Sequence, residues 1–557
     1  TLHVELNVFN EVTIGLHVTN LANFFAFLSA FSLLLISFLT HHLKQSNLFY
    51  ILLHLLNASI FLILYADDYL LFFIGWEIMG VVTYFLLAQT LSSHALHKYI
   101  IFTMTSAFSL LMAMMILYSV SHSFLYSDAR IAFEAMGELK SAIFISLMLV
   151  AFFIKLGAIG FHYWLVDSYE QSSNIFTPYL SAVMSKMAVF ALIVLLVKVV
   201  NISTLSTPTL SYTLAIMGLL SSIIATFKAI NEDSIKRVLA YSSIAQLGYI
   251  VTVLALANGV GGALYHSLIH TSVKLLLFIN IAGVAYVTSK SKFSELGGLI
   301  YKMPHSFVML LIGIIVLAGM PPLGGFNSKF IIYTTLMDDK MLLILAAMMF
   351  ASASAFLYIY KLVYGIYLGQ PTSKKLESIK EAPVMFLIPQ YILATIVVLL
   401  GAYPSIVVPY FNSILSELHV TQMQFLNVTT LMSPMGKYNG FVVFGAFVAI
   451  FAAVLLFVVL QRSRKKEAKN RFDIAYCGEE PNDSTHLHYG YSIGKELRRI
   501  GFVSTILKNS SSKFYDFVAI QTLSFSQILR KIYSGSLSVN FHIAIIFVII
   551  LLWWVIK

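Results

Sequence analysis

Long apolar stretches separated by short polar segments recur along the whole chain. A helix needs roughly 20 apolar residues to cross a bilayer, and this criterion predicts about fourteen membrane-spanning helices. They fall at 21–40, 48–66, 69–90, 98–120, 141–160, 174–200, 209–229, 238–257, 262–287, 306–337, 341–366, 384–408, 439–461 and 541–556. The pattern therefore predicts an all-α, polytopic membrane protein.

The polar segments between these spans divide the chain further. Residues 1–20 (TLHVELNVFNEVTIGLHVTN) predict a short, hairpin-like strand pair without the character of a cleavable signal. The successive regions are then expected to be a membrane core, a linker with one span, a basic cytoplasmic segment with an amphipathic helix, and a final span, at 21–410, 411–461, 462–540 and 541–557.

Composition excludes a soluble globular domain. Hydrophobic residues make up 59% of the chain and charged residues 11%, with a mean hydropathy of +0.86, whereas roughly 25% of the residues of a soluble domain are charged. The single Cys477 leaves no disulfide, CxxC motif or iron–sulfur ligand set, so we expect no cofactor and no metal in this chain.

The basic residues report topology rather than nucleic-acid binding. Alternating the loops between two sides gathers most of the lysines and arginines, including the run RSRKKEAKNR, on one side. By the positive-inside rule this side is cytoplasmic, which puts the N-terminus outside and the chain in the cytoplasmic (inner) membrane of a cell. Lys198 and Lys361 lie near span ends and are expected to snorkel to the interface.

Five charged residues lie inside predicted spans: Glu77, Lys155, Lys186, Lys274 and Lys329. A charge at the bilayer centre costs at least about 3 kcal/mol and is kept only where it faces protein or water. An isolated buried carboxylate favours protonation, so Glu77 is expected to pair with a cation, for which Lys155 is the natural candidate. The set indicates an ion path through the membrane.

Two of these lysines adjoin helix breakers. Gly157 and Gly160 follow Lys155, while Pro321, Pro322, Gly324 and Gly325 precede Lys329. Broken backbone survives in a membrane only beside protein or a wet cavity, and inverted-repeat transporters place ion sites at such breaks. A kinked helix with a snorkelling lysine is the alternative.

His266, His270 and Lys274 are spaced by four within one span. This spacing puts them on one helix face, with about 6 Å of rise between neighbours. Such a face can pass a proton along the helix. The alternative is a polar stripe that holds helices together, and metal binding would need more ligands than the face supplies.

Six segments that carry these residues resemble a known family, the antiporter-like membrane subunits of respiratory complex I, Mrp-type cation/proton antiporters, and energy-converting hydrogenases with their formate-hydrogenlyase relatives. The segments are WEIMGVVTYFLLA, AFFIKLGAIGFHYWLVDSY, SAVMSKMAVFAL, EDSIKRVLAYSSIAQLGYI, ALYHSLIHTSVKLLLFIN and LAGMPPLGGFNSKFII, in family order between about 20 and 410. The resemblance is specific because all six occur together.

The resemblance implies two inverted five-helix repeats with broken helices. Glu77 then takes the family's glutamate position, Lys155 and Lys329 the lysines of the two broken helices, and Lys186 the lysine of the central bridge. His266, His270 and Lys274 fill the connecting region. It also implies proton translocation coupled to redox chemistry in other, iron–sulfur-containing subunits of an oxidoreductase complex.

Two features depart from the family pattern. Family members usually begin with two further helices, which we expect to be lost here or supplied by another subunit. Ser106 stands where the complex I subunit with the long lateral helix tends to have an aspartate, which favours the Mrp and hydrogenase types.

The tail resembles the hydrogenase type, in which an amphipathic helix runs along the cytoplasmic face and ends in one more span. Leu497, Ile500, Val503, Ile506 and Leu507 form its apolar positions near 490–535. A helix that simply lies on lipid is the alternative.

We therefore expect a proton-translocating subunit of a multisubunit, redox-driven pump of the hydrogenase or complex I type. Protons are favoured because lysine and histidine transfer them, whereas Na⁺ prefers oxygen ligands. The alternatives are a Mrp-type Na⁺/H⁺ antiporter subunit without a redox module, and a membrane anchor that couples a soluble catalytic subunit to ion flow.

Overall fold

The structure is a computed structural model. It describes residues 3–8, 12–201, 208–368, 376, 378–433, 436–461, 499–501, 503–504 and 510–532. The chain divides into two compact units, residues 1–496 and 497–557.

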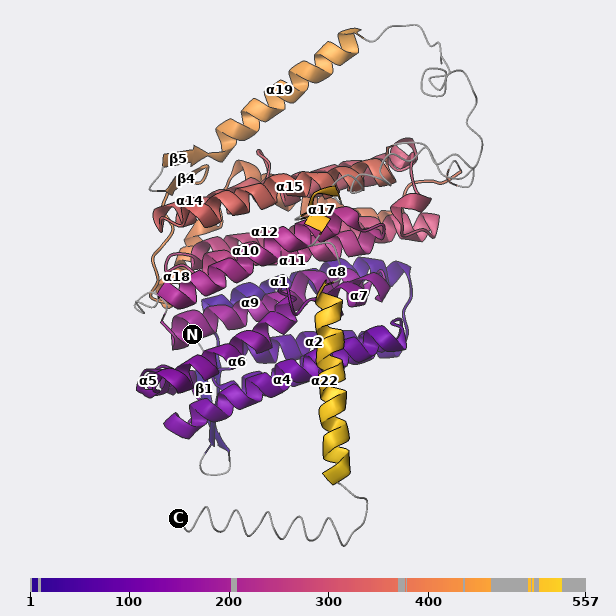
Figure 1. Cartoon of the computed structure of the whole chain (residues 1–557). Coiled ribbons are helices and arrows are strands. Elements are labelled where there is room, and N and C mark those ends of the chain that lie inside the picture. The colour runs from indigo at the N-terminus through magenta and orange to yellow at the C-terminus, as the bar shows by residue number, and fades with distance from the viewer. Residues whose placement is uncertain are drawn as a thin grey trace, which may run out of the picture. The chain divides into compact units, whose positions relative to one another are not determined.

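The first unit is a bundle of helices (Figure 1). Its long helices are α1 (Asn20–His42), α2 (Asn47–Tyr65), α3 (Tyr69–Ala88), α4 (Ser93–Ser121), α6 (Glu138–Leu156), α10 (Pro208–Asn231), α11 (Ile235–Leu254), α12 (Val260–Thr288), α13 (Pro304–Ala318), α14 (Gly324–Asp338), α15 (Leu342–Ile366), α17 (Val384–Ala402) and α19 (Gly440–Gln461). Helix α9 (Ser185–Ile193) is short. Shorter helices are α5 (Tyr126–Ala135), α7 (Tyr163–Gln171), α8 (Phe176–Tyr179) and α18 (Val408–Glu417). Helix α9 is continued on both sides by π-helical turns at Leu180–Met184 and Val194–Val199.

The helices match the predicted spans closely. In the described residues, 12 helical segments are long and apolar enough to cross a membrane. The predicted span 306–337 is absent from these because it consists of two helices, α13 and α14. The predicted span 541–556 lies outside the described residues. The chain is a multi-pass integral membrane protein.

Burial is uneven across the spans. In the most apolar 18-residue stretch of each span, all residues are buried for Phe176–Val199, 94% for α11 and 89% for α12, whereas only 6% are buried for α19. Helices α11 and α12 pack against each other within the bundle (Figure 1). Two of the intramembrane charges, Lys186 and Lys274, lie on these inner helices, so the surrounding helices shield those two charges from lipid.

The N-terminal strand pair is confirmed. Strands β1 (His3–Val8) and β2 (Val12–His17) pair antiparallel, with His3 opposite His17. Asp68 holds the pair against the bundle, because its two carboxylate oxygens accept hydrogen bonds from the Gly15 amide at 2.9 Å and the Leu71 amide at 2.7 Å. The second bond caps helix α3, so one side chain fixes both elements.

A small sheet that hydropathy did not predict lies within 411–461. Strands β3 (Phe425–Asn427), β4 (Thr430–Ser433) and β5 (Gly436–Asn439) pair antiparallel in that order. Leu431 and Tyr438 pack with Val408 against Phe326 and Phe330 of α14. The sheet therefore supports the helix that carries Lys329.

Lys361 does not snorkel, so that expectation was wrong. Its side chain is 3% exposed, and its ammonium donates to the carbonyl oxygens of Ile230, at 3.3 Å, and Glu232. It lies 5.2 Å from the centre of the Phe293 ring. The last carbonyls of α10 lack partners within their own helix, and Lys361 supplies donors to them.

In the second unit the structure describes one long helix, α22 (Ser510–Ile532). Large apolar residues, including Phe514, Phe517 and Leu523, recur at helical spacing along it and are exposed, as the predicted amphipathic character requires. Of the predicted apolar positions before it, Ile500 is 52% exposed and Val503 is buried, while Leu497, Ile506 and Leu507 lie outside the described residues.

Candidate ion path

The first helix break positions Lys155. Helix α6 ends at Leu156, and Gly157 caps it with φ +74°, a left-handed conformation that favours glycine. A Cβ at Gly157 would also collide with the Leu165 side chain of α7. Gly160, with φ +97°, lies in the turn before α7. The break leaves Lys155 buried in the last turn of α6, at 2% exposure.

Aromatic rings surround the Lys155 ammonium in place of hydrogen-bond partners. Nζ lies 6.0 Å from the Trp76 ring centre and 5.7 Å from that of Tyr99, and no hydrogen bond to it exists in the described part of the chain. Glu77 interacts with it electrostatically, but the two residues form no ion pair within 4.0 Å. The predicted pairing is therefore a proximity of charges rather than a closed salt bridge.

Ser106 forms hydrogen bonds to two neighbouring helices beside Lys155. Trp76 Nε1 donates to Ser106 Oγ at 3.1 Å, and Ser106 Oγ donates to the Ala151 carbonyl at 2.9 Å. Ala151 lies one turn before Lys155 on α6. The residue that marks the departure from the complex I pattern thus links α3, α4 and α6 beside the lysine.

The second helix break positions Lys329. Helix α13 ends at Ala318, Gly319 follows with φ +73°, and α14 begins at Gly324 after Pro321 and Pro322. A Cβ at Gly325 would collide with the Val316 carbonyl, and one at Gly324 would approach Ile269 Cδ1 to 2.7 Å. These two glycines allow the halves of the broken helix and α12 to pack closely.

The break supplies acceptors to Lys329. With α13 ended, the Ala318 carbonyl is free to accept a hydrogen bond from Lys329 Nζ at 2.9 Å. Ser352 Oγ of α15 lies 2.7 Å from the same ammonium, and the Tyr249 ring centre lies 5.0 Å away. Lys329 is 2% exposed, so it is buried in protein rather than snorkelling.

Two hydrogen bonds and one pair of stacked histidine rings connect α9, α12 and α14 between the two breaks. Lys186 Nζ lies 2.7 Å from His270 Nδ1. The His270 and His266 rings are nearly parallel, with centres 6.3 Å apart, and His266 Nδ1 lies 3.0 Å from Ser328 Oγ. Ser328 precedes Lys329. The structure therefore joins Lys186 to the neighbourhood of Lys329 through both predicted histidines.

Lys274 lies one turn beyond His270 and faces α11. It is fully buried, and its ammonium donates to Ser242 Oγ at 2.5 Å and to the Leu239 carbonyl at 3.0 Å. It interacts electrostatically with His270 and Lys186, which places three titratable groups in one buried cluster.

Helix α11 contributes polar groups that the sequence analysis missed. Ser242 bonds Lys274, Gln246 donates to the Leu317 carbonyl at 3.4 Å, and Tyr249 packs beside Lys329 and His266. Their spacing of four and three residues puts them on one helix face. That periodicity in YSSIAQLGY was the available signal.

The sequence patterns also did not identify His162, which lies in the first helix break. It is 2% exposed, and neither ring nitrogen has a hydrogen-bond partner in the described residues. Its ring lies 6.0 Å from that of Tyr241. Beyond it, Arg237 pairs with Asp167, Glu170 and Glu232 at 2.9–3.0 Å. The ion pairs of Arg237 thus lie near the buried His162 ring, whose two nitrogens make no hydrogen bond in the described residues.

No described hydrogen bond joins Lys155 to Lys186. The closest link is from α3, where Thr83 Oγ1 lies 3.4 Å from Met184 Sδ. The predicted residues therefore form two groups: Glu77 with Lys155, and a second group made of Lys186, His266, His270, Lys274 and Lys329. A proton path through both groups would need water or side-chain motion between them.

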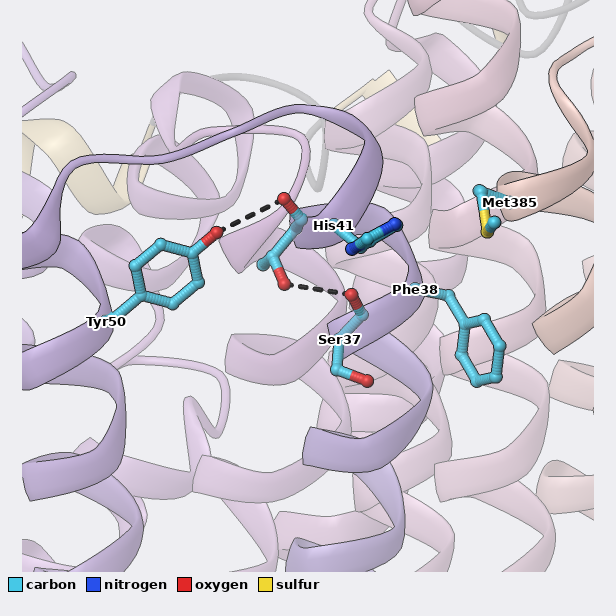
Figure 2. Close-up of a pocket in the computed structure, with 6 residues that line it drawn as sticks. Ser37, Phe38, His41, Tyr50 and Met385 are labelled. Atoms are coloured by element: carbon cyan, nitrogen blue, oxygen red, sulfur yellow. Dashed lines mark hydrogen bonds between the residues drawn. The ribbon is translucent and has the colours of Figure 1, made fainter.

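The surface hollows lie apart from this series. Figure 2 shows one of about 470 Å³ at the end of α1, lined by Ser37, Phe38, Thr40, His41, Tyr50 and Met385. Tyr50 donates to the Thr40 carbonyl there at 3.2 Å. Across the described residues, no three His, Cys, Asp or Glu side chains are arranged to hold a metal ion.

Comparison with known proteins decides the family. Residues 66–355, more than half of the chain, match the family described as NADH:quinone oxidoreductase/Mrp antiporter, TM. The chain belongs to this family. It is an antiporter-like membrane subunit, and both broken helices with Lys155 and Lys329 lie within the matched residues.

Individual relatives span three kinds of complex. A chain of the membrane-bound sulfane sulfur reductase, an archaeal respiratory membrane complex, is 26% identical with a TM-score of 0.88, over 99% of this chain and 91% of that one. NADH-quinone oxidoreductase subunit N of Azobacteroides pseudotrichonymphae is 27% identical, over 65% of this chain and 75% of that protein. A Na(+)/H(+) antiporter protein of Alkalihalophilus pseudofirmus is 23% identical, over 67% of this chain and 49% of that longer protein.

Proposed function

We propose that this chain translocates protons as part of a multisubunit, redox-driven membrane complex. The observation that carries the proposal is the buried series of Lys186, His270, His266 and Ser328, which ends beside Lys329 at a helix break. Lysine and histidine exchange protons, and buried charges in membranes mark ion pathways.

The geometry supports the following roles for these residues. Lys155 and Lys329 hold protons at the two breaks, and the Glu77 carboxylate responds to the charge on Lys155. Lys186, His266, His270 and Lys274 connect the two sites. The chain itself holds no cofactor, and electron transfer belongs to iron–sulfur subunits elsewhere in the complex.

The exposure of Glu77 supports a neighbouring membrane subunit. This residue is half-buried on α3, and its buried Oε1 has no hydrogen-bond partner in the described residues. A charged side chain that is only partly covered inside a bilayer is costly unless another protein or water covers it. The likeness to a respiratory complex subunit over 99% of the chain favours a redox module over an isolated antiporter. Mrp-type Na⁺/H⁺ exchange without a redox module is the second candidate, favoured by the match to a Na(+)/H(+) antiporter protein.

The positive-inside rule supports placement in the cytoplasmic membrane with the tail on the cytoplasmic face. Helix α22 then lies along that surface and contacts lipid or a neighbouring subunit.

The test is purification of the complex with its native partners and reconstitution into vesicles. Proton uptake that requires the redox donor and acceptor, with iron–sulfur subunits present, supports the proposal. Na⁺-driven proton movement in a preparation with only hydrophobic subunits would establish the Mrp-type alternative instead. Turnover of a single soluble catalytic partner would favour the membrane-anchor alternative.

A further inference from the structure

His266 and His270 make different hydrogen bonds although they lie one turn apart on α12. Both are buried, at 3% and 1% exposure. Each uses Nδ1 for a hydrogen bond, and neither Nε2 has a partner within hydrogen-bond distance in the described residues. The neutral imidazole carries one N–H and one lone pair, so the two Nδ1 partners determine what each Nε2 offers.

The hydrogen bonds of Ser328 determine which ring nitrogen of His266 carries the hydrogen. A serine hydroxyl has one hydrogen, and Ser328 Oγ lies 3.0 Å from the Gly325 carbonyl, which can only accept. With that hydrogen donated to Gly325, Ser328 Oγ accepts from His266 Nδ1 at 3.0 Å. His266 therefore carries its N–H on Nδ1, and its Nε2 lone pair is available.

The hydrogen bond from Lys186 places the hydrogen of His270 on the other ring nitrogen, Nε2. A charged ammonium has donors and no acceptor, so His270 Nδ1 accepts from Lys186 Nζ across 2.7 Å. His270 then carries its N–H on Nε2. The pair thus presents an N–H on one histidine and a lone pair on the other.

We propose that Ser328 is a positioning residue that holds His266 as the Nδ1–H tautomer, so that His266 can receive a proton from His270. This inference rests on the proposed function and deepens it. Lys186 Nζ gives a proton to His270 Nδ1 while His270 Nε2–H passes its proton to His266 Nε2. The second transfer runs through one water, because rings with centres 6.3 Å apart do not contact directly.

The step conserves protons and moves one charge. Lys186 becomes a neutral amine, His270 remains neutral with its N–H moved to Nδ1, and His266 becomes an imidazolium ion. One positive charge has then passed from α9 to the side of α12 that faces Lys329.

The experiment measures the tautomer directly in the whole purified complex. Ring ¹⁵N chemical shifts of labelled histidine distinguish the two tautomers, and His266→Gln identifies the His266 signals. Ser328→Ala removes the acceptor, while Ser328→Thr keeps the hydroxyl. Ser272→Ala is the matched control, because Ser272 is a buried serine of α12 whose hydroxyl bonds the Leu268 carbonyl, at 3.0 Å, of its own helix.

We expect the Nδ1–H form of His266 in the native protein, Ser272→Ala and Ser328→Thr, and a majority of the Nε2–H form in Ser328→Ala. Proton translocation in reconstituted vesicles should fall roughly ten-fold or more in Ser328→Ala and recover in Ser328→Thr. If the Ser328→Ala complex does not assemble, Ser328→Cys replaces it, because the cysteine thiol is a weaker acceptor of similar size. The Ser328→Cys variant should show an intermediate ratio of the two His266 tautomers.

Three outcomes would overturn the proposal: an Nε2–H tautomer in the native protein, an unchanged tautomer in an assembled Ser328→Ala complex, or a changed tautomer with normal translocation. The NMR signal needs no turnover. A native complex that moves no protons would therefore refute the proposed function without affecting the assignment of the tautomer.

Discussion

Lys329 and Ser352 are joined by a 2.7 Å hydrogen bond between the second broken helix and α15. Lys329 Nζ donates this bond to Ser352 Oγ. The same ammonium also donates to the Ala318 carbonyl oxygen, which has no partner within α13. Lys155, at the other break, has only aromatic rings and a nearby carboxylate. Each lysine lies beside a helix break, Lys155 before it and Lys329 after it, and the two are held in chemically different ways.

Lys155→Met and Lys329→Met should each abolish ion translocation in an assembled complex. Methionine replaces the lysine with a similar volume and removes the exchangeable proton. Translocation is measured as acidification of reconstituted vesicles. Lys361→Met is the matched control, because Lys361 is an equally buried lysine that bonds backbone carbonyl oxygens, and it should lower thermal stability while translocation persists. Near-normal pumping by Lys329→Met would reduce that residue to a structural role.

Glu77→Gln should impair translocation more than Glu77→Asp. The proposed role is a negative charge that interacts with Lys155, and aspartate keeps that charge while glutamine only keeps the shape. Initial rates of proton uptake in the two variants decide the matter. Equal losses would indicate that the site demands the shape of glutamate rather than its charge.

Lys186→Met and His270→Gln should be non-additive. Their side chains share one hydrogen bond and act on the same proton, so the double variant should be no slower than the slower single variant. Losses that multiply in the double variant would place the two residues in separate paths.

Asp68 should make stability depend on pH. Burial raises the pKa of its carboxyl above the ordinary value, against the opposing effect of the backbone amides that it accepts. A raised pKa in the folded state means that the contribution of this group to stability is full below about pH 4 and is lost as the pH rises through the raised pKa. Asp68→Asn should therefore melt at a lower temperature than the native protein at acidic pH, with a gap that narrows at neutral pH.

Asp68→Ala provides the companion measurement. It removes the cap of α3 and leaves the Gly15 and Leu71 amides without their acceptor, which should cost about 1–3 kcal/mol. A melting temperature equal to that of the native protein would show that the strand pair does not depend on these two hydrogen bonds.

Deleting residues 484–557 should weaken assembly without disturbing the buried series. The deletion removes α22, whose apolar residues are exposed and are proposed to contact lipid or a neighbouring subunit. Native mass spectrometry of the purified truncated protein reports which partners remain. Retention of every partner with normal pumping would make the tail a surface appendage.

Hydropathy predicted the spans because each helix must satisfy its own backbone in lipid. It did not predict β3–β5, since a small sheet outside the apolar stretches leaves no such signal. Charges inside apolar stretches identified Glu77 and the four buried lysines for the same energetic reason.

The serines escaped notice because a hydroxyl costs little in a membrane helix and is common there. Ser242, Ser328 and Ser352 become informative only when the lysine or histidine that each one bonds is known. Likewise, the absence of an ion pair between Glu77 and Lys155 depends on distances that sequence spacing does not contain.

The contrast in hydropathy between helices has a consequence for how the protein is made. Helix α11 has a mean hydropathy of 1.3 and α19 one of 2.7. A translocon releases segments into lipid according to their apolar character, so α19 can partition alone, whereas α11, with Lys236 and Gln246 buried among its neighbours, gains most of its stability from α10 and α12. Insertion of α11 is therefore expected to be cooperative with that of α12, so this buried part of the bundle forms as a unit rather than helix by helix.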